Sequence, residues 1–258
     1  MGEPMIKLDK VVDEASLDKA VDIVSNVCGT CSFQTLCAPV ALNEQDMQEL
    51  NVVTKQSRRL RKGECLFRAG ERFHSLFAVR TGFFKMIATT VDGRNQITGF
   101  FMSGELLGLD GICAKRYACN AVALEDSEVC ELPFEHFKKT CTQYPHLHHH
   151  FYQMMSQEIV RSHEAMLALA NMCAEERLIV FLLNLSYRLN IRGFSSNDFI
   201  LRMSREEIGS YLGVKLETVS RMLSHFSQEG WIRVDHKHIQ LLKPEILKRM
   251  VSGCQPEV

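Results

Sequence analysis

Residues 205–224 read REEIGSYLGVKLETVSRMLS, and this stretch decides the fold of the carboxyl-terminal part of the chain. Ser204 and Glu207 have the spacing of a capping box, which predicts a helix that begins directly after Ser204. Gly209 lies where two helices must approach closely and a larger side chain would hold them apart. Gly213 follows four residues later, at a tight turn, where a left-handed backbone conformation suits glycine. The stretch therefore predicts two short helices joined by a tight turn.

The residues around this turn supply the apolar contacts between the two helices. Val219 follows Gly213 by six residues, and the other apolar positions are Ile208, Leu212, Val214 and Met222. A small residue, then glycine, then a β-branched residue at these offsets is typical of a helix-turn-helix. The alternative is a surface helix pair with chance spacing. Two strand-like stretches, 231–234 and 238–242, follow at once and predict a small hairpin, or wing, which favours the helix-turn-helix.

The second helix leaves one polar face exposed. Its buried face is predicted to hold Val219, Met222, Leu223 and Phe226. Glu217, Ser220 and Arg221 then share the opposite face, at i, i+3 and i+4. Arginine can bind guanine O6 and N7, glutamate can accept from cytosine N4, and serine can donate or accept, so this face suits base edges in a major groove. Lys215 stands where a capping hydroxyl is usual, and a nearby DNA phosphate best explains a cation there. Double-stranded DNA is the predicted partner.

The middle of the chain is rich in short β-type runs. Examples are 76–80, 83–90 and 95–101, which glycines separate. Asp92-Gly93 between two of these runs predicts a two-residue hairpin loop. The stretch from about Arg58 to Leu132 is therefore expected to form an antiparallel β-roll or barrel. Its glycines punctuate strands and do not open a helix, so no dinucleotide or phosphate-loop fingerprint is present.

A long helix is predicted from Pro145 to about Asn171. Apolar or small residues recur in it at steps of four, three, four and three, which is the pattern of a seam that packs against one partner helix; they are Met155, Ile159, Ser162, Met166 and Leu169. At ~1.5 Å per residue the helix approaches 40 Å. A core helix within one domain is the alternative, but this length favours a homodimer interface.

Three cysteines, Cys28, Cys31 and Cys37, form a Cys-x2-Cys-x5-Cys run. Three thiolates within ten residues can bind one side of a soft metal centre. An iron–sulfur cluster with a distant fourth thiolate is one interpretation, and zinc and redox-active or chance thiols are the others. His146 and His150 stand one turn apart and could also bind zinc, although a solvated helix start is the simpler interpretation of them.

Length and composition limit the other possibilities. The chain has 258 residues, with 30 Lys and Arg against 31 Asp and Glu, which predicts about two domains. No apolar run approaches the ~18–20 residues of a membrane span, and charged residues interrupt the amino terminus, so no signal-peptide core is seen. We therefore expect a cytoplasmic protein without a membrane partner, in which the ten cysteines are reduced. No nucleophile, base and orienting acid occur at motif spacing, so the sequence does not favour an enzyme.

The order of these parts resembles the Crp/Fnr superfamily of transcription regulators over nearly the whole chain, and it is most similar to the oxygen-responsive Fnr and Anr-type anaerobic regulators. The segments that carry the resemblance are 28–37, QITGF at 96–100, VCELPF at 129–134, AEERL at 174–178 and ETVSR at 217–221.

The resemblance implies an α+β fold in four parts. These are a cysteine-rich, cluster-binding segment (1–40), an antiparallel β-roll similar to cyclic-nucleotide-binding domains (41–144), a dimerisation helix (145–171) and a winged helix-turn-helix domain (172–258).

The resemblance also implies site residues. Cys28, Cys31, Cys37 and Cys130 would ligate an oxygen-labile 4Fe-4S cluster. Without the resemblance, Cys130 would be interpreted as an apolar strand residue.

For the remaining partners, the resemblance implies that Glu217, Ser220 and Arg221 recognise a TTGAT-type half-site. Two such sites form a palindrome for the dimer. The segments 88–94 and 191–196 resemble surfaces that contact RNA polymerase, as in activators or repressors of anaerobic genes.

Two departures from the family pattern and several alternatives remain. Lys215 replaces the usual threonine or serine, and Ser162 stands on the dimer seam where relatives can carry a charge, which predicts looser control of dimerisation by oxygen. A nitric oxide or haem sensor is an alternative within the superfamily. A cyclic-nucleotide sensor would need a hydroxyl after Arg116, where the chain has Tyr117. An iron–sulfur enzyme or electron carrier is disfavoured, because neither needs a helix-turn-helix.

Overall fold

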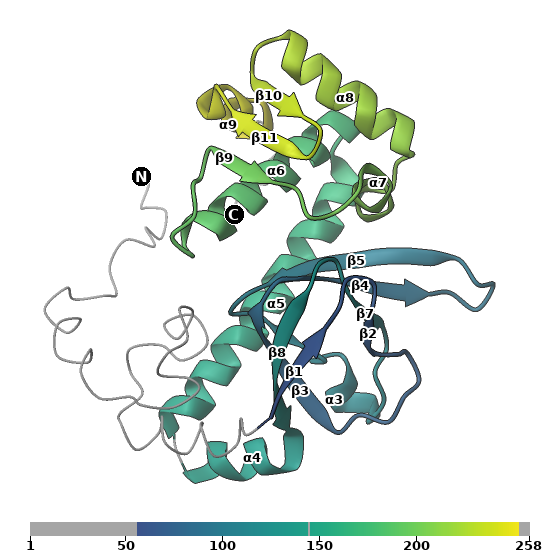
Figure 1. Ribbon diagram of the computed structural model, residues 1–258, viewed down its shortest axis with the longest axis vertical. Helices are drawn as coiled ribbons and strands as arrows, with labels where there is room; N and C mark the ends of the chain where they lie inside the picture. Colours follow the sequence, from purple (N-terminus) through teal and green to yellow (C-terminus); the bar gives the residue numbers. More distant parts are fainter. Residues whose placement is uncertain (1–55, 144, 253–258) are drawn as a thin grey trace, which may run out of the picture.

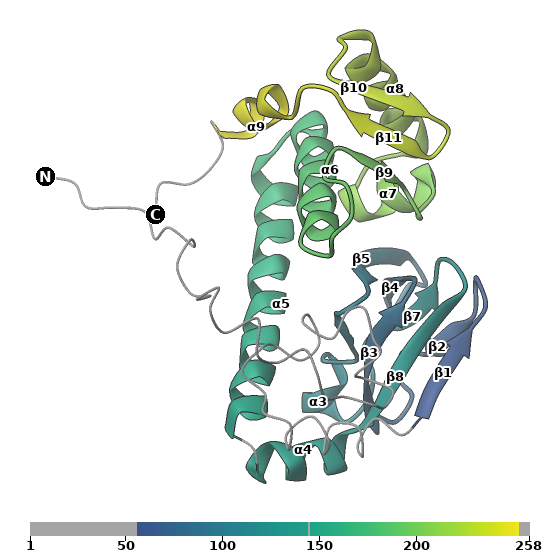
Figure 2. The same ribbon diagram turned by 60° about the vertical axis from the view of Figure 1, so that its left-hand side comes forward.

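The computed structural model describes residues 56–143 and 145–252 (Figure 1). A β-rich body occupies one end and a smaller, mainly helical body the other, and one long helix runs beside both (Figure 2). The β-rich body contains β1 (Gln56–Leu60), β2 (Cys65–Phe67), β3 (Ser75–Thr81), β4 (Phe83–Thr89), β5 (Asn95–Met102), β6 (Leu106–Leu107), α3 (Gly111–Ala114), β7 (Asn120–Ala123), β8 (Ser127–Pro133) and α4 (Phe134–Gln143). The helical part contains α5 (Pro145–Asn171), α6 (Ala174–Asn190), β9 (Asp198–Ile200), α7 (Arg205–Leu212), α8 (Leu216–Gln228), β10 (Ile232–Asp235), β11 (His238–Leu241) and α9 (Pro244–Ser252).

The β-rich body is the expected antiparallel roll. Its strands form two four-stranded sheets, in the orders β1-β8-β3-β6 and β2-β7-β4-β5, and every pairing is antiparallel. Both sheets contribute to one apolar core, which includes Leu76, Phe77 and Val129 from the first sheet and Phe84 and Ala121 from the second. The predicted fold class is confirmed.

The hairpin between β4 and β5 differs from the sequence prediction in its loop. The Thr90 N–H donates to the Arg94 carbonyl (2.9 Å) and the Gly93 N–H donates to the Thr90 carbonyl (2.9 Å). The loop therefore has three residues, Val91, Asp92 and Gly93, and the prediction of a two-residue loop was wrong. The reason is the place of Gly93, whose φ of +82° supplies the left-handed residue that follows the turn in three-residue hairpins.

The long helix expected from Pro145 is present as α5. Its first turns pack on the roll, since Leu147 is buried in the roll core and Phe151 and Met154 lie against that core. The sequence interpretation missed α4, which buries Phe137 and Cys141 and precedes α5. No helix within the described ranges combines the length and hydropathy of a membrane span.

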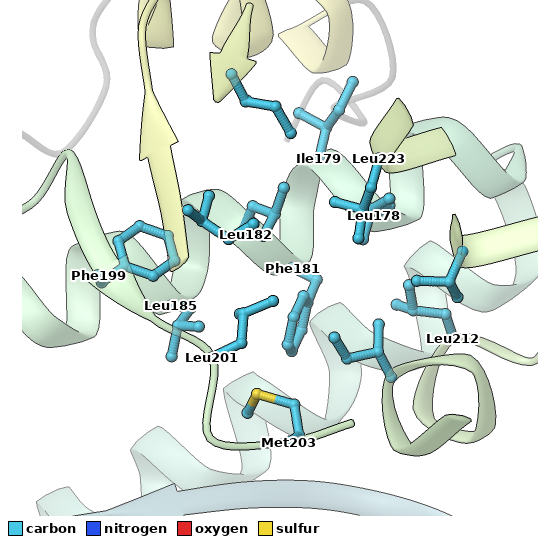
Figure 3. Packing of buried hydrophobic residues seen from close by; sticks show 14 of the residues in the cluster. Leu178, Ile179, Phe181, Leu182, Leu185, Phe199, Leu201, Met203, Leu212 and Leu223 are labelled. Carbon is cyan, nitrogen blue, oxygen red and sulfur yellow. The ribbon is translucent and has the colours of Figure 1, made fainter. Parts of the chain in front are cut away.

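The helical body differs from the expected plan in two elements. A helical unit closed by one hairpin was predicted, whereas β9 adds a third strand beside β11, in the order β10-β11-β9. Phe199 of β9 is the reason, because it is buried with Leu182 and Leu185 of α6 (Figure 3). The helix α9 was also missed, and its Leu247 lies fully buried in the same core.

Candidate nucleic-acid interface

The turn between α7 and α8 has the predicted local geometry. The Ser204 hydroxyl accepts from the Glu207 N–H (3.1 Å), and the Glu207 carboxylate accepts from the Ser204 N–H (2.6 Å), so both halves of the capping box are made. Gly213 has a φ of +67°. A Cβ on Gly209 would lie 2.7 Å from the Val214 carbonyl oxygen. The close neighbour of Gly209 is therefore the backbone of the turn, and a side chain there would force the turn away.

The recognition helix α8 has one buried and one exposed face. The buried residues are Val219, Met222, Leu223 and Phe226, as expected. Glu217 and Arg221 are exposed, one turn apart. Ser220 is half-buried, and its hydroxyl accepts from the Arg205 guanidinium (3.3 Å). The structure thus brings the three predicted base-reading residues onto one face.

Arg205 is a neighbour of this face that the sequence analysis did not single out. Its guanidinium reaches from the start of α7 to Ser220 on α8. Arg205 thereby adds a positive charge beside the exposed face of α8, and arginine is a common partner of DNA phosphates. No local feature of the sequence points to this contact, because it joins two helices.

Lys215 occupies the N-cap position of α8, with φ −77° and ψ 155°, and its side chain makes no capping hydrogen bond. The residue is exposed. An ammonium group at a helix N-terminus opposes the helix dipole. Lys215 thus stands, exposed, two residues before Glu217 at the start of α8.

The face of α5 that was predicted as a dimer seam is largely open in the single chain. Ile159 and Met166 are 53% and 60% exposed, and Leu169 is also exposed. Met155 is half-buried, and Ser162 is exposed with its hydroxyl donating to the Glu158 carbonyl (2.9 Å). Large apolar side chains repeated along one helix face are the usual mark of a protein-binding surface.

Cys130 is the one predicted cluster ligand within the described residues. It lies on β8, opposite Ala78 of β3 and Ser57 of β1, and it is 9% exposed. It belongs to neither of the hydrophobic clusters found in the described part of the chain. Cys28, Cys31 and Cys37 lie outside the described residues. Among residues 56–143 and 145–252, no three His, Cys, Asp or Glu side chains gather in a way that could hold a metal ion.

The place where a cyclic nucleotide would need a hydroxyl is filled by a buried aromatic ring. Tyr117 stacks on Phe67 with ring centroids 3.9 Å apart, and its hydroxyl donates to the Ser75 carbonyl (2.8 Å). Burial raises the pKa of this phenol. Arg116 donates to the Gly70 carbonyl (2.6 Å). Both residues therefore serve the packing of the roll.

The two segments that resemble polymerase contacts are accessible. Val91 at the tip of the β4–β5 hairpin is fully exposed, as expected for the 88–94 loop. Ile191 and Phe194, in the segment between α6 and β9, are each about half exposed. Each segment thus presents an apolar side chain that is at least about half exposed.

Comparison with known proteins gives the same picture in two parts. Residues 57–144 match the cyclic nucleotide-binding domain family, and residues 176–250 match the Crp-like helix-turn-helix domain family. Among solved structures, FixK2 from Bradyrhizobium japonicum is similar with a TM-score of 0.69 and 28% identity, covering 75% of this chain and 96% of that one.

Curated relatives align along nearly the whole chain. The transcriptional activator protein FnrA of Stutzerimonas stutzeri is 45% identical over 227 residues, covering 88% of this chain and 93% of its own. The transcriptional activator protein Anr of Pseudomonas aeruginosa is 45% identical over 226 residues, with the same coverage. The fumarate and nitrate reduction regulatory protein of Escherichia coli is 39% identical over 225 residues, covering 87% and 90%. The chain therefore belongs to the Crp/Fnr superfamily, in the group of Fnr- and Anr-type activators, and it is a DNA-binding transcription regulator and not an enzyme.

Proposed function

We propose that this regulator senses oxygen through a 4Fe-4S cluster and binds palindromic DNA as a homodimer while the cluster is intact. In this proposal residues 1–40 bind the cluster, 41–144 form the roll, 145–171 pair the two subunits and 172–258 bind DNA. The observation that carries it is the Cys-x2-Cys-x5-Cys run together with Cys130, in a chain that aligns with Fnr and Anr activators over most of its length.

The donor set fits such a cluster, which takes four cysteine thiolates. Cys28, Cys31, Cys37 and Cys130 would hold it. When bound, the cluster supplies a centre that oxygen degrades. Cys130 is buried on β8, where it is 9% exposed. Ligation by all four would tie the amino-terminal segment to β8, and losing that tie would change the relative stability of monomer and dimer.

The subunit interface in this proposal is the exposed face of α5. A tenfold shift in a dimer equilibrium needs only ~1.4 kcal/mol. Pairing two helices through Ile159, Met166 and Leu169 removes apolar surface from water at roughly 25 cal/mol per Å². A change of only a few kcal/mol in the stability of this interface can therefore shift the protein between monomer and dimer.

An acidic side chain on this face should separate the subunits. For Ile159→Asp we expect a monomer at concentrations where the wild type is a dimer, because pairing would bury a carboxylate against its symmetry mate. Light scattering without air measures this. Gln157→Glu places the same charge on the opposite, exposed side of α5 and should leave the dimer intact. A dimeric Ile159→Asp variant would show that α5 pairs through another face or not at all.

DNA recognition in this proposal uses Glu217, Ser220 and Arg221 on base edges and Lys215 on phosphate. Only a dimer spans two TTGAT-type half-sites about one helical turn apart. Loop 88–94 and segment 191–196 would contact RNA polymerase, and the outcome would be activation or repression of anaerobic genes. We propose that the protein acts in the cytoplasm, where a bacterial regulator meets DNA and polymerase.

The decisive experiment is purification without air. We expect a coloured protein with about four iron and four sulfide per chain, as a cubane cluster requires. Admitting air should bleach the visible spectrum and weaken binding to a TTGAT palindrome, and a parallel sample given nitric oxide tests that alternative signal. A colourless, iron-free protein that binds the palindrome equally before and after aeration would refute the proposal.

A further inference from the structure

One buried carboxylate joins the roll to the helical body. Glu105 follows Gly104, which has a φ of +85°, in the turn between β5 and β6, and it is only 7% exposed. The Met102 N–H donates to its Oε2 (3.1 Å). The roll thus holds this side chain in place from its own side.

Three arginines surround the same carboxylate, one from α5, one from α6 and one from the segment that follows α6. Arg188 of α6 binds both oxygens, with Nε to Oε1 at 3.1 Å and Nη2 to Oε2 at 2.6 Å. Arg192, just beyond α6, reaches Oε1 at 2.8 Å, and Arg161 of α5 reaches Oε2 at 3.4 Å. Burial opposes ionisation of Glu105, but the three guanidinium groups outweigh it and hold its pKa below the ordinary value.

The arginines also bind backbone carbonyls of the roll. Arg188 donates to the Phe100 carbonyl (2.7 Å) and Arg192 to the Ser103 carbonyl (2.6 Å). Their side chains are 12% and 4% exposed. A planar guanidinium bound at two points has a fixed orientation. This junction therefore specifies an angle between α6 and the roll, which apolar contact alone does not do, because hydrophobic attraction is not directional.

A second polar contact lies at the other end of the same interface. Lys85 of β4 pairs with Glu207 of α7 at 2.6 Å, and the Ile97 N–H donates to the Ser210 hydroxyl (3.1 Å). The strands β4 and β5 lie next to α7 in both views (Figures 1 and 2). Arg202 and Glu125 form a further ion pair between the helical body and the roll (3.2 Å). Of the three carboxylates in these contacts, Glu105 is the most deeply buried.

We propose that Glu105 is a positioning residue that sets the orientation of the DNA-binding domain on the roll and α5, and thereby selects the spacing between the two half-sites. The inference rests on the proposed function, because it needs two recognition helices held in one dimer. One inserted base pair moves a half-site by about 3.4 Å and about a tenth of a turn. A rigid junction would hold the two recognition helices at one separation, so binding to the displaced half-site would weaken. A flexible junction would let the recognition helix move to the displaced half-site, so binding would weaken less.

The test measures spacing preference in the full-length protein without air. The DNAs are a TTGAT palindrome of the preferred spacing, the same palindrome with one base pair inserted or removed, and a duplex with a single half-site. We expect the wild type to lose about tenfold or more on the altered spacings. Glu105→Gln should reduce this difference to about threefold or less, while its affinity for the single half-site stays within about twofold.

A matched control removes an ion pair inside the roll. Glu128 pairs with Arg80 at 3.0 Å, with both side chains partly buried on β8 and β3. Glu128→Gln should keep the wild-type spacing preference. If Glu105→Gln does not fold, Arg188→Lys serves instead, because it keeps the charge and loses the two-point contact, and the same loss of preference is expected.

The outcomes separate the inference from the proposed function. A folded Glu105→Gln or Arg188→Lys variant that keeps the wild-type preference overturns the role of Glu105 alone. A wild type that binds all spacings and the single half-site alike overturns the dimer proposal together with the inference. Loss of the spacing preference in Glu128→Gln as well would also overturn the inference about Glu105, because the loss of any ion pair in the roll would then have the same effect on spacing preference.

Discussion

Cys130→Ser protein purified without air is expected to contain no iron and no sulfide and to bind the TTGAT palindrome no better than aerated wild type. A serine hydroxyl stays protonated near neutral pH, whereas cluster iron requires thiolate ligands. The substitution changes one atom on a strand residue that is 9% exposed, so the roll should still fold. Metal and sulfide analysis, the visible spectrum and a DNA-binding titration together measure the effect.

Two other cysteines provide controls for this variant. Cys113 is exposed at α3, and Cys141 is buried in α4, where desolvation raises the pKa of its thiol to about 11. Cys113→Ser and Cys141→Ser should both retain iron and sulfide, and Cys141→Ser also reproduces the burial of Cys130. Full cluster assembly in Cys130→Ser would show that another residue is the fourth ligand.

Arg221→Ala should weaken binding to the palindrome by about 1–3 kcal/mol per half-site, which is roughly fivefold to 150-fold for each. The reason is the loss of a two-point contact between an exposed guanidinium on α8 and a guanine edge. Binding to random duplex depends on phosphates and should change much less. Fluorescence anisotropy with both DNAs at one salt concentration gives the comparison.

The guanine itself supplies the sharper test of this prediction. Replacing the half-site G·C pair should weaken wild-type binding but should have little further effect on Arg221→Ala, because the two changes remove the same contact. Arg249→Ala, an exposed position on α9, removes an equal charge and should behave as wild type. If Arg221→Ala lost affinity equally for specific and random DNA, Arg221 would contact phosphate and not a base.

The sequence predicted those elements whose cause is local. A capping box, a left-handed glycine and a buried face at helical spacing lie together within residues 204–226, and α7 and α8 have them as expected. The strand β9 has three residues with one buried side chain, Phe199, and it exists because β11 lies beside it. The helix α9 depends in the same way on a distant core that receives Leu247. Neither β9 nor α9 has a periodic pattern of apolar residues that is long enough to identify in the sequence.

The candidate site follows the same rule. The exposed positions of Glu217 and Arg221 follow from helix periodicity. The contact of Arg205 with Ser220 joins two helices, and the convergence of three arginines on Glu105 joins three elements, so nothing local predicts either. Cys130 was assigned by family resemblance, since its own neighbourhood in the sequence indicates only a strand.

The apolar core of the helical body does not stop at the family boundary. Ile97, Phe100 and Met102 of the roll strand β5 belong to the same cluster as α6 and α7, and Phe100 meets the rings of Phe181 and Tyr211. Chimeras that exchange one domain between relatives must therefore transplant this strand face too. A fragment that ends at the domain junction would expose to solvent the aromatic rings that are buried between the two parts. The two parts match two separate family models, yet in this chain they contribute to one continuous apolar core.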